Sequence, residues 1–239
     1  DEEEKIREDL ERTLREYERE LRRAKEELKE TLKRYEEELR EVKEDLDRTL
    51  EEVDDLLRRG ELEDREAIRI LRELLKKLEE IIRRSKEVLD KLIKDLEDIS
   101  RRSIEVLEEL VKKVRKDGLP EEVLRRIKDL IRRLRERNKE ILDRIRKLIE
   151  ELVERNKRAL DRLRKLIKEL EERVRRTDDK KTLLRDLKEA LKTLIKLIRE
   201  ILEDNLRVLR RIIELIETLL EDNRRVLEEI IKLIEEATT

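Results

Sequence analysis

A spacing of 18 residues recurs along the whole of this 239-residue chain. Four pairs of identical polar residues show it: Tyr17 and Tyr35, Ser85 and Ser103, Asn138 and Asn156, and Asn205 and Asn223. Eighteen residues make five turns of an α-helix at about 3.6 residues per turn, so residues at this spacing point in the same direction. A heptad pattern drifts around the helix and produces a left-handed supercoil, whereas an 18-residue pattern does not drift. The spacing therefore predicts long, nearly straight helices with little or no supercoil.

The composition is that of long helices, with 56% charged, 36% hydrophobic and 1% aromatic residues. Lys and Arg number 66 and Asp and Glu number 68, which gives a net charge of -2. Because the two signs are interleaved, no basic surface for nucleic acid or anionic lipid is expected. No apolar run approaches the roughly 18 residues that cross a bilayer, and no stretch has the features of a signal peptide. We expect a soluble protein that binds neither nucleic acid nor membranes, and the sequence does not indicate its localisation.

The residue types that usually bind metals and cofactors are missing. The sequence has no Cys and no His, so disulfides and the usual ligands of zinc, copper and haem are absent. Four-helix bundles that bind two iron or manganese ions use inward-facing Glu residues and a Glu-x-x-His pattern, which this sequence lacks. We therefore expect no cofactor and no metal.

Three places carry the signals that end one helix and begin the next. Gly60 follows two Arg residues, and Gly118 is followed by Pro120 and two acidic residues. The segment 177–179, Thr-Asp-Asp, supplies a Thr or Asp N-cap without any glycine. These signals predict helices over about 2–58, 62–116, 120–176 and 178–237. Since long helices joined by short loops fold back on one another, we predict an all-α, antiparallel, up-down-up-down four-helix bundle that forms a single domain over 1–239.

The apolar stripes of the predicted helices differ in width. Counting about 100° per residue, the stripe of the first helix covers about 100° and that of the fourth about 180°. Either the fourth helix is more buried than the first, or part of its apolar face serves a partner. In the second case the partner surface consists of residues at the borders of the stripes of the second and fourth helices: Leu75, Ile93, Ile104, Val111, Ile195, Leu206, Ile213 and Ile231.

The polar residues at the 18-residue spacing are predicted to lie at the same level in all four helices. Facing positions in two antiparallel helices have residue numbers with a constant sum, and half of that sum falls at the turn. For Tyr17 and Ser103, half of the sum falls at Gly60. For Ser103 and Asn138 it falls beside Pro120, and for Asn138 and Asn223 it falls near Lys181. We therefore predict two polar layers. The first contains Tyr17, Ser103, Asn138, Asn223, Thr13 and Ser100, and the second contains Tyr35, Ser85, Asn156, Asn205 and Thr31. One step further, the same arithmetic predicts an apolar layer of Val53, Ala67, Val174 and Leu187.

Three interpretations of the polar layers differ in what they require. A catalytic tyrosine with an asparagine oxyanion donor needs a general base, but there is no His and no carboxylate at the centre of any stripe, so we expect no enzyme. Exchangeable lipid-binding helices are disfavoured by asparagines at the stripe centre and by the absence of Trp and Phe. The interpretation that remains is a satisfied hydrogen-bond network that sets the register of the helices.

Taken together, these features resemble a known class of proteins. The 18-residue repeats, the aliphatic core without His, Cys, Met, Trp or Phe, the charged runs such as Glu171-Glu172-Arg173 and the polar layers resemble de novo designed parametric helical bundles with buried hydrogen-bond networks. This resemblance implies a hyperstable structural scaffold with no evolved activity, in which the layers give pairing specificity. The alternative is a protomer of a designed homo-oligomer, hetero-complex or filament that self-associates or binds a partner chain through the apolar borders of the second and fourth helices.

Overall fold

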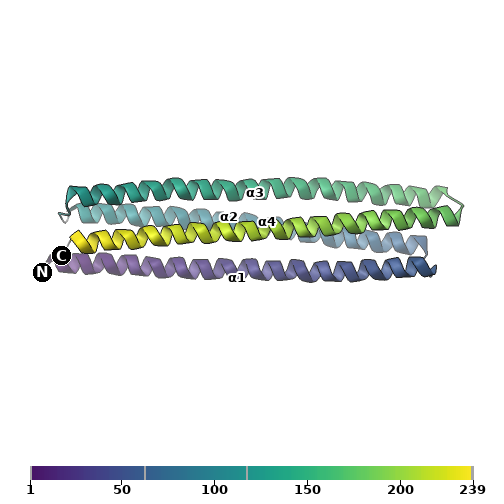
Figure 1. Cartoon of the computed structure of the whole chain (residues 1–239), viewed down its shortest axis with the longest axis horizontal. Coiled ribbons are helices and arrows are strands. Elements are labelled where there is room, and N and C mark those ends of the chain that lie inside the picture. Colours follow the sequence, from purple (N-terminus) through teal and green to yellow (C-terminus); the bar gives the residue numbers. More distant parts are fainter. Residues whose placement is uncertain (1, 62, 117, 238–239) are drawn as a thin grey trace. The chain divides into compact units, whose positions relative to one another are not determined.

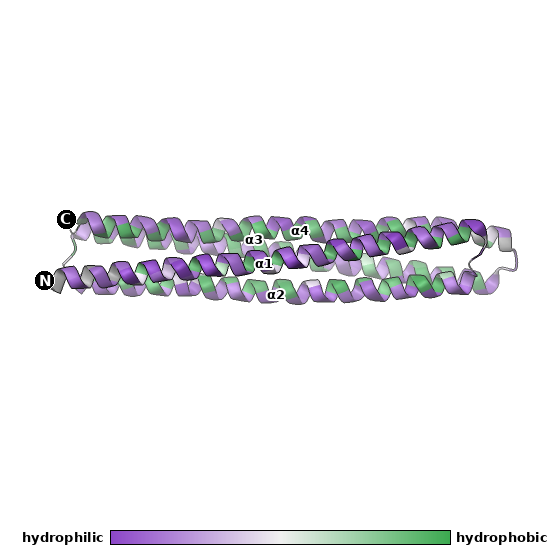
Figure 2. Ribbon diagram, turned by 90° about the horizontal axis from the view of Figure 1, so that it is seen from below, coloured by the Kyte–Doolittle hydropathy of each residue, from purple (hydrophilic) through white to green (hydrophobic). Residues whose placement is uncertain are grey.

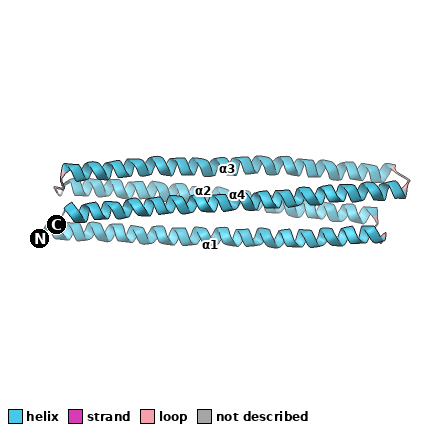
Figure 3. Ribbon diagram, in the orientation of Figure 1, coloured by secondary structure: helices cyan, strands magenta, loops and turns pink. Residues whose placement is uncertain are grey.

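The computed structural model describes residues 2–61, 63–116 and 118–237. The chain forms four α-helices, α1 (Glu2–Arg59), α2 (Asp64–Lys116), α3 (Glu121–Arg176) and α4 (Lys180–Ala237), joined by short loops (Figures 1 and 3). No strand occurs in the described part of the chain. The fold is an up-down-up-down four-helix bundle, as predicted, and the helix bounds differ from the predicted ones by two residues or fewer. Residue 62, where we placed the start of the second helix, lies outside the described residues.

The end of α1 has the hydrogen bonds of a Schellman motif. Gly60 has a φ of 70°, its N–H donates to Leu57 O at 3.3 Å, and Glu61 N donates to Leu56 O at 3.1 Å. These two bonds satisfy carbonyls that the last turn leaves free, and only glycine adopts this conformation without steric cost. Glu63 directly precedes α2, and its carbonyl accepts from the N–H groups of Glu66 and Ala67.

The starts of α3 and α4 use different caps. The carbonyl of Pro120 accepts the first helical hydrogen bonds, from Val123 N at 3.1 Å and Leu124 N at 3.2 Å, so Pro120 directly precedes the first turn of α3. Before α4 the cap is Asp179, whose carboxylate accepts from Thr182 Oγ1 at 2.8 Å and from Lys181 N at 3.2 Å. These two hydrogen bonds lower the pKa of Asp179 and resolve the choice between Thr and Asp as the N-cap.

The chain divides into two compact units, each with one stretch of every helix. Unit 1 comprises Asp1–Leu32, Asp90–Lys147 and Arg211–Thr239, and unit 2 comprises Lys33–Leu89 and Leu148–Arg210. Within each unit, ion pairs join α1 to α2, α2 to α3, α3 to α4, and α4 to α1. In unit 1 these are Arg102–Glu20, Arg146–Glu97, Arg137–Asp222 and Lys29–Glu217. In unit 2 they are Arg84–Glu38, Arg164–Glu79, Arg155–Asp204 and Arg199–Asp47. Each unit is therefore a ring of four antiparallel neighbours.

The ion pairs repeat the 18-residue spacing of the sequence. Both partners of the α1–α2 pair Arg102–Glu20 are shifted by 18 positions in Arg84–Glu38, and both pairs have N···O distances of 3.2 Å. Exposed ion pairs contribute about 0–1 kcal/mol each to the free energy of unfolding. The repetition of the ion pairs is therefore evidence for a shared register of the helices, and the pairs themselves add little to the stability.

The core is mostly aliphatic, and α4 contributes most of its hydrophobic side chains. Each helix carries apolar and polar residues in alternating patches (Figure 2). Among the described residues, 18 hydrophobic side chains of α4 are buried but only 11 of α1, so the wider stripe of α4 is covered by its neighbours. No large hydrophobic side chain in the described part of the chain is exposed. The residues at the borders of the apolar stripes differ in burial: Ile104, Val111 and Leu206 are buried, and Leu75, Ile93, Ile195, Ile213 and Ile231 are half-buried.

The predicted apolar layer belongs to the core of unit 2. Val53, Ala67 and Leu187 are each no more than 2% exposed, and Val174 packs against the cluster that contains Leu187. Val174 and the cluster around Leu187 therefore meet as predicted, and Val53 and Ala67 are buried in the same unit.

Candidate functional site: two buried polar layers

Each unit contains one pair of buried asparagines, contributed by α3 and α4. In unit 1, Asn138 Nδ2 donates to Asn223 Oδ1 at 3.2 Å and Asn223 Nδ2 donates to Asn138 Oδ1 at 2.9 Å. In unit 2, Asn156 and Asn205 form the same reciprocal pair at 3.0 and 2.9 Å. All four side chains are at most 4% exposed. The predicted meeting of Asn138 with Asn223 and of Asn156 with Asn205 is confirmed.

The α4 asparagine of each pair is the more fully bonded partner. Asn223 Nδ2 also donates to Leu219 O at 2.6 Å, and Asn205 Nδ2 also donates to Ile201 O at 2.7 Å. Both amide hydrogens of the α4 asparagines are therefore used. The α3 partners, Asn138 and Asn156, use one amide hydrogen each in the described structure.

An ion pair lies beside each asparagine pair and joins the same two helices. Arg137 pairs with Asp222 and Arg155 pairs with Asp204, each at 2.7 Å, and these are the residues directly before the asparagines. A third pair, Arg173–Asp186 at 3.8 Å, stands beside Val174 and Leu187, where apolar residues replace the asparagines. Sequence reasoning missed these ion pairs. The signal is present, since Arg-Asn and Asp-Asn each occur twice at the 18-residue spacing.

The tyrosines and serines are buried at the predicted positions, but they do not complete the network. Tyr17, Tyr35, Ser85 and Ser103 are at most 6% exposed. Ser103 Oγ donates to Ile99 O of its own helix at 2.8 Å, whereas Tyr17 Oη, Tyr35 Oη and Ser85 Oγ have no hydrogen-bond partner in the described structure. Beyond the asparagine pairs, the predicted satisfied hydrogen-bond network is therefore not confirmed in the described structure. A tyrosine hydroxyl, at the end of its ring, and the hydroxyl of a short serine can lie at the same level of the bundle and still not have the distance and angle of a hydrogen bond.

The remaining predicted members fall outside the layers or at their edge. Ser100 is buried at 8% exposure. Thr13 and Thr31 are exposed, and their hydroxyls donate to Asp9 O and Glu27 O of their own helix, each at 2.9 Å. Their assignment to the layers is wrong. Threonine hydroxyls readily bond the carbonyl four residues earlier, which satisfies them without another helix.

Burial is the main influence on the acidity of the two tyrosines. It raises the pKa of Tyr17 and Tyr35 well above the ordinary value of 10.0, because the phenolate loses its hydration. The carboxylates of Glu20 and Glu38 raise these pKa values further, and Arg102 and Arg84 partly oppose them. Each phenol thus lies close to an ion pair that joins α1 and α2.

We expect neither tyrosine to ionise in the folded protein at about pH 11, where an unfolded tyrosine is mostly phenolate. Since the folded pKa is raised, the stabilisation is fully present below pH 10 and is lost as the pH rises above it, by about 1.4 kcal/mol per pH unit for each tyrosine. Phenolate absorbance, titrated with and without guanidinium, measures this. A native titration midpoint near 10 contradicts the burial of the hydroxyls.

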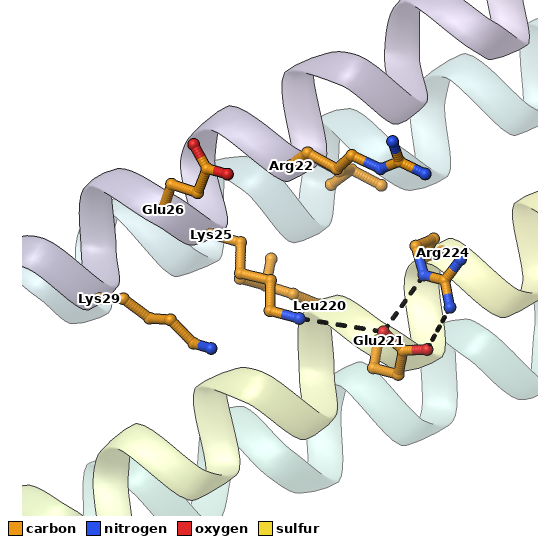
Figure 4. A pocket seen from close by; sticks show the side chains of 8 residues that line it. Arg22, Lys25, Glu26, Lys29, Leu220, Glu221 and Arg224 are labelled. Carbon is orange, nitrogen blue, oxygen red and sulfur yellow. Dashed lines mark hydrogen bonds and ion pairs between the residues drawn. The ribbon is translucent and has the colours of Figure 1, made fainter.

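One surface groove is lined by paired cations. In unit 1 a groove of about 420 Å³ lies between α1 and α4, with Leu21 and Leu220 among its lining residues (Figure 4). Glu221 interacts there with both Lys25 and Arg224, and the hydrogen bond from Arg224 lowers the pKa of Glu221. The other two cations of the groove, Arg22 and Lys29, pair with glutamates outside it, so each of its cations has an acidic partner.

The described residues include no group of three or more potential metal ligands. Within the same part of the chain, no helix combines the length and apolar character needed to cross a membrane. No protein-family model matches the sequence, and no curated protein matches it.

Proposed function

We propose that this chain is a designed, hyperstable structural scaffold without enzymatic activity, in which the buried asparagine pairs give pairing specificity to the helices. The observation that carries the proposal is the reciprocal hydrogen bonding of Asn138 with Asn223 and of Asn156 with Asn205 in a mostly aliphatic core. A buried amide without a partner costs about 1–3 kcal/mol. A displaced register would leave these amides opposite leucine or isoleucine, so the pairs favour one register over the others.

The proposal is tested by replacing one asparagine or both. Asn223→Leu leaves Asn138 buried without its reciprocal partner, and the free energy of unfolding should fall by about 1–3 kcal/mol. The double variant Asn138→Leu with Asn223→Leu removes donor and acceptor together, so its stability should equal or exceed that of the parent. Guanidinium unfolding of the three proteins measures both effects.

The pairing specificity of the helices is tested by a separate measurement. A protein with both asparagine pairs replaced by leucine should keep its stability but populate slipped or intermolecular pairings, which light scattering coupled to size exclusion detects as a mixture of masses. The matched control is the apolar layer, where Leu187→Ile changes the shape of a buried side chain without changing its polarity. If the all-leucine variant remains homogeneous and has the mass of the parent, the asparagines do not provide specificity.

The second candidate function is a protomer of a designed assembly, held through the apolar borders of α2 and α4. One observation favours it: Leu75, Ile93, Ile195, Ile213 and Ile231 are only half-buried. The absence of exposed large hydrophobic side chains in the described part of the chain weighs against it, because stable interfaces have an apolar core. The mass of the parent protein in solution distinguishes the two functions.

A further inference from the structure

A groove of about 420 Å³ lies between α3 and α4 in unit 2, next to the Asn156–Asn205 pair. Asn156 is one of its lining residues, and Ala159, Leu197 and Ile201 give it apolar surface. Ligand-binding clefts have volumes of about 300–1,000 Å³, so the groove has room for a small organic molecule.

The groove lies where the 18-residue repeat changes from a large side chain to a small one. Ile141 of unit 1 is the counterpart of Ala159, and Leu215 is the counterpart of Leu197. Ile141 and Leu215 are 4% and 6% exposed, whereas Ala159 and Leu197 are both half-buried. Since Ala159 and Leu197 line the same groove, we attribute the exposure of Leu197 to the shorter side chain at position 159.

The charges on the groove also depart from the repeat. Arg158 and Arg162 lie one turn apart on α3, line the groove and form no ion pair with any residue that the structure describes. The counterpart of Arg158 in unit 1 is an acid, Glu140. The other charged lining residues, apart from Glu200, have ion-pair partners: Arg155 and Arg207 pair with Asp204, and Glu203 pairs with Lys43. Two arginines against one glutamate leave the groove with an excess of positive charge.

We propose that this groove binds one small amphipathic organic anion, with a sulfonate or carboxylate group on an apolar body. The apolar body packs on Ala159, Leu197 and Ile201, and the acid group accepts hydrogen bonds from Arg158 and Arg162. Because exposed charges interact weakly in water, the apolar contact provides most of the affinity and the arginines select the sign of the ligand. This inference goes beyond the proposed function and holds whether the chain acts as a scaffold or as a protomer.

Isothermal titration calorimetry of the full chain with anilinonaphthalene sulfonate tests the proposal. We expect one site per chain. Ala159→Ile fills the groove with the side chain found in unit 1 and should weaken binding about tenfold or more. Arg158→Gln with Arg162→Gln keeps the apolar surface and should weaken binding about threefold to tenfold. The matched control, Lys139→Gln with Arg144→Gln, removes two charges from α3 outside the groove and should keep the parent affinity.

A gain of binding provides the converse test. Glu140→Arg with Ile141→Ala places the two distinguishing residues of the groove at their counterparts in unit 1, and the number of sites should rise from one to two. Circular dichroism verifies that each variant is folded. The proposal is overturned if the parent does not bind, if Ala159→Ile binds as the parent does, or if the control loses as much affinity as the arginine variant. A single site in the unit 1 variant also overturns it, because the anion is then not selected by these residues.

Discussion

Replacing Asn205 with Asp is expected to lower the free energy of unfolding by about 3–5 kcal/mol at neutral pH. Both amide hydrogens of Asn205 are used, towards Asn156 Oδ1 at 2.9 Å and Ile201 O at 2.7 Å. A carboxylate at this position turns both hydrogen bonds into contacts between oxygen atoms. At 4% exposure, water cannot compensate for the charge.

The loss should depend on pH in a defined direction. Burial raises the pKa of the introduced carboxyl group above its unfolded value of about 3.9. Below that value both states are protonated and the loss is smallest, and it grows as the pH rises towards the folded pKa. Guanidinium unfolding at about pH 4 and pH 7 measures the difference. The control Thr193→Asp adds a charge at an exposed position of α4 and should cost about 0.5 kcal/mol or less. A loss of only about 0.5 kcal/mol at both pH values would mean that position 205 is open to solvent.

The sequence could predict the levels of the layers, because level and face depend only on residue number and helical period. Asn138 and Asn223 were paired correctly for this reason, and the loops were placed by glycine, proline and capping residues with well-defined conformations. Hydrogen bonding within a layer could not be predicted. Hydrogen bonding depends on side-chain rotamers and on differences in distance of a few tenths of an ångström. The helical period of the sequence does not specify either. Thr13 shows the limit, since its hydroxyl bonds within its own helix.

The ion pairs and the stripe widths posed a different difficulty. With 56% charged residues, each surface arginine has several acidic residues within reach, so the partner of Arg137 could not be read from the sequence alone. The wide apolar stripe of α4 allowed two explanations, a more buried helix or a partner surface, because the burial of one helix depends on its neighbours. The narrow stripe of α1 leaves much of the core for α4 to fill, as the burial of Leu206 at the border of its stripe shows.

Replacing Leu78 with Ala is expected to lower the free energy of unfolding by about 2–5 kcal/mol. The side chain is fully buried at 0% exposure in α2, so its removal loses both transfer free energy and packing contacts. Leu75 lies one turn earlier in the same helix and is half-buried. Because solvent can fill the space that Leu75 vacates, Leu75→Ala should cost about 1 kcal/mol or less if the chain is a monomer.

This matched pair also distinguishes the two candidate functions. In an assembly built on the border of α2, Leu75 is buried in the interface, and its truncation should then approach the cost of truncating Leu78 and weaken association. Unfolding measured at two protein concentrations separates the cases, since the stability of an assembly rises with concentration and that of a monomer does not. A large, concentration-dependent loss for Leu75→Ala would favour the assembly. A small, concentration-independent loss beside a large loss for Leu78→Ala would favour the scaffold, because only a side chain enclosed by its own bundle contributes to stability at every concentration.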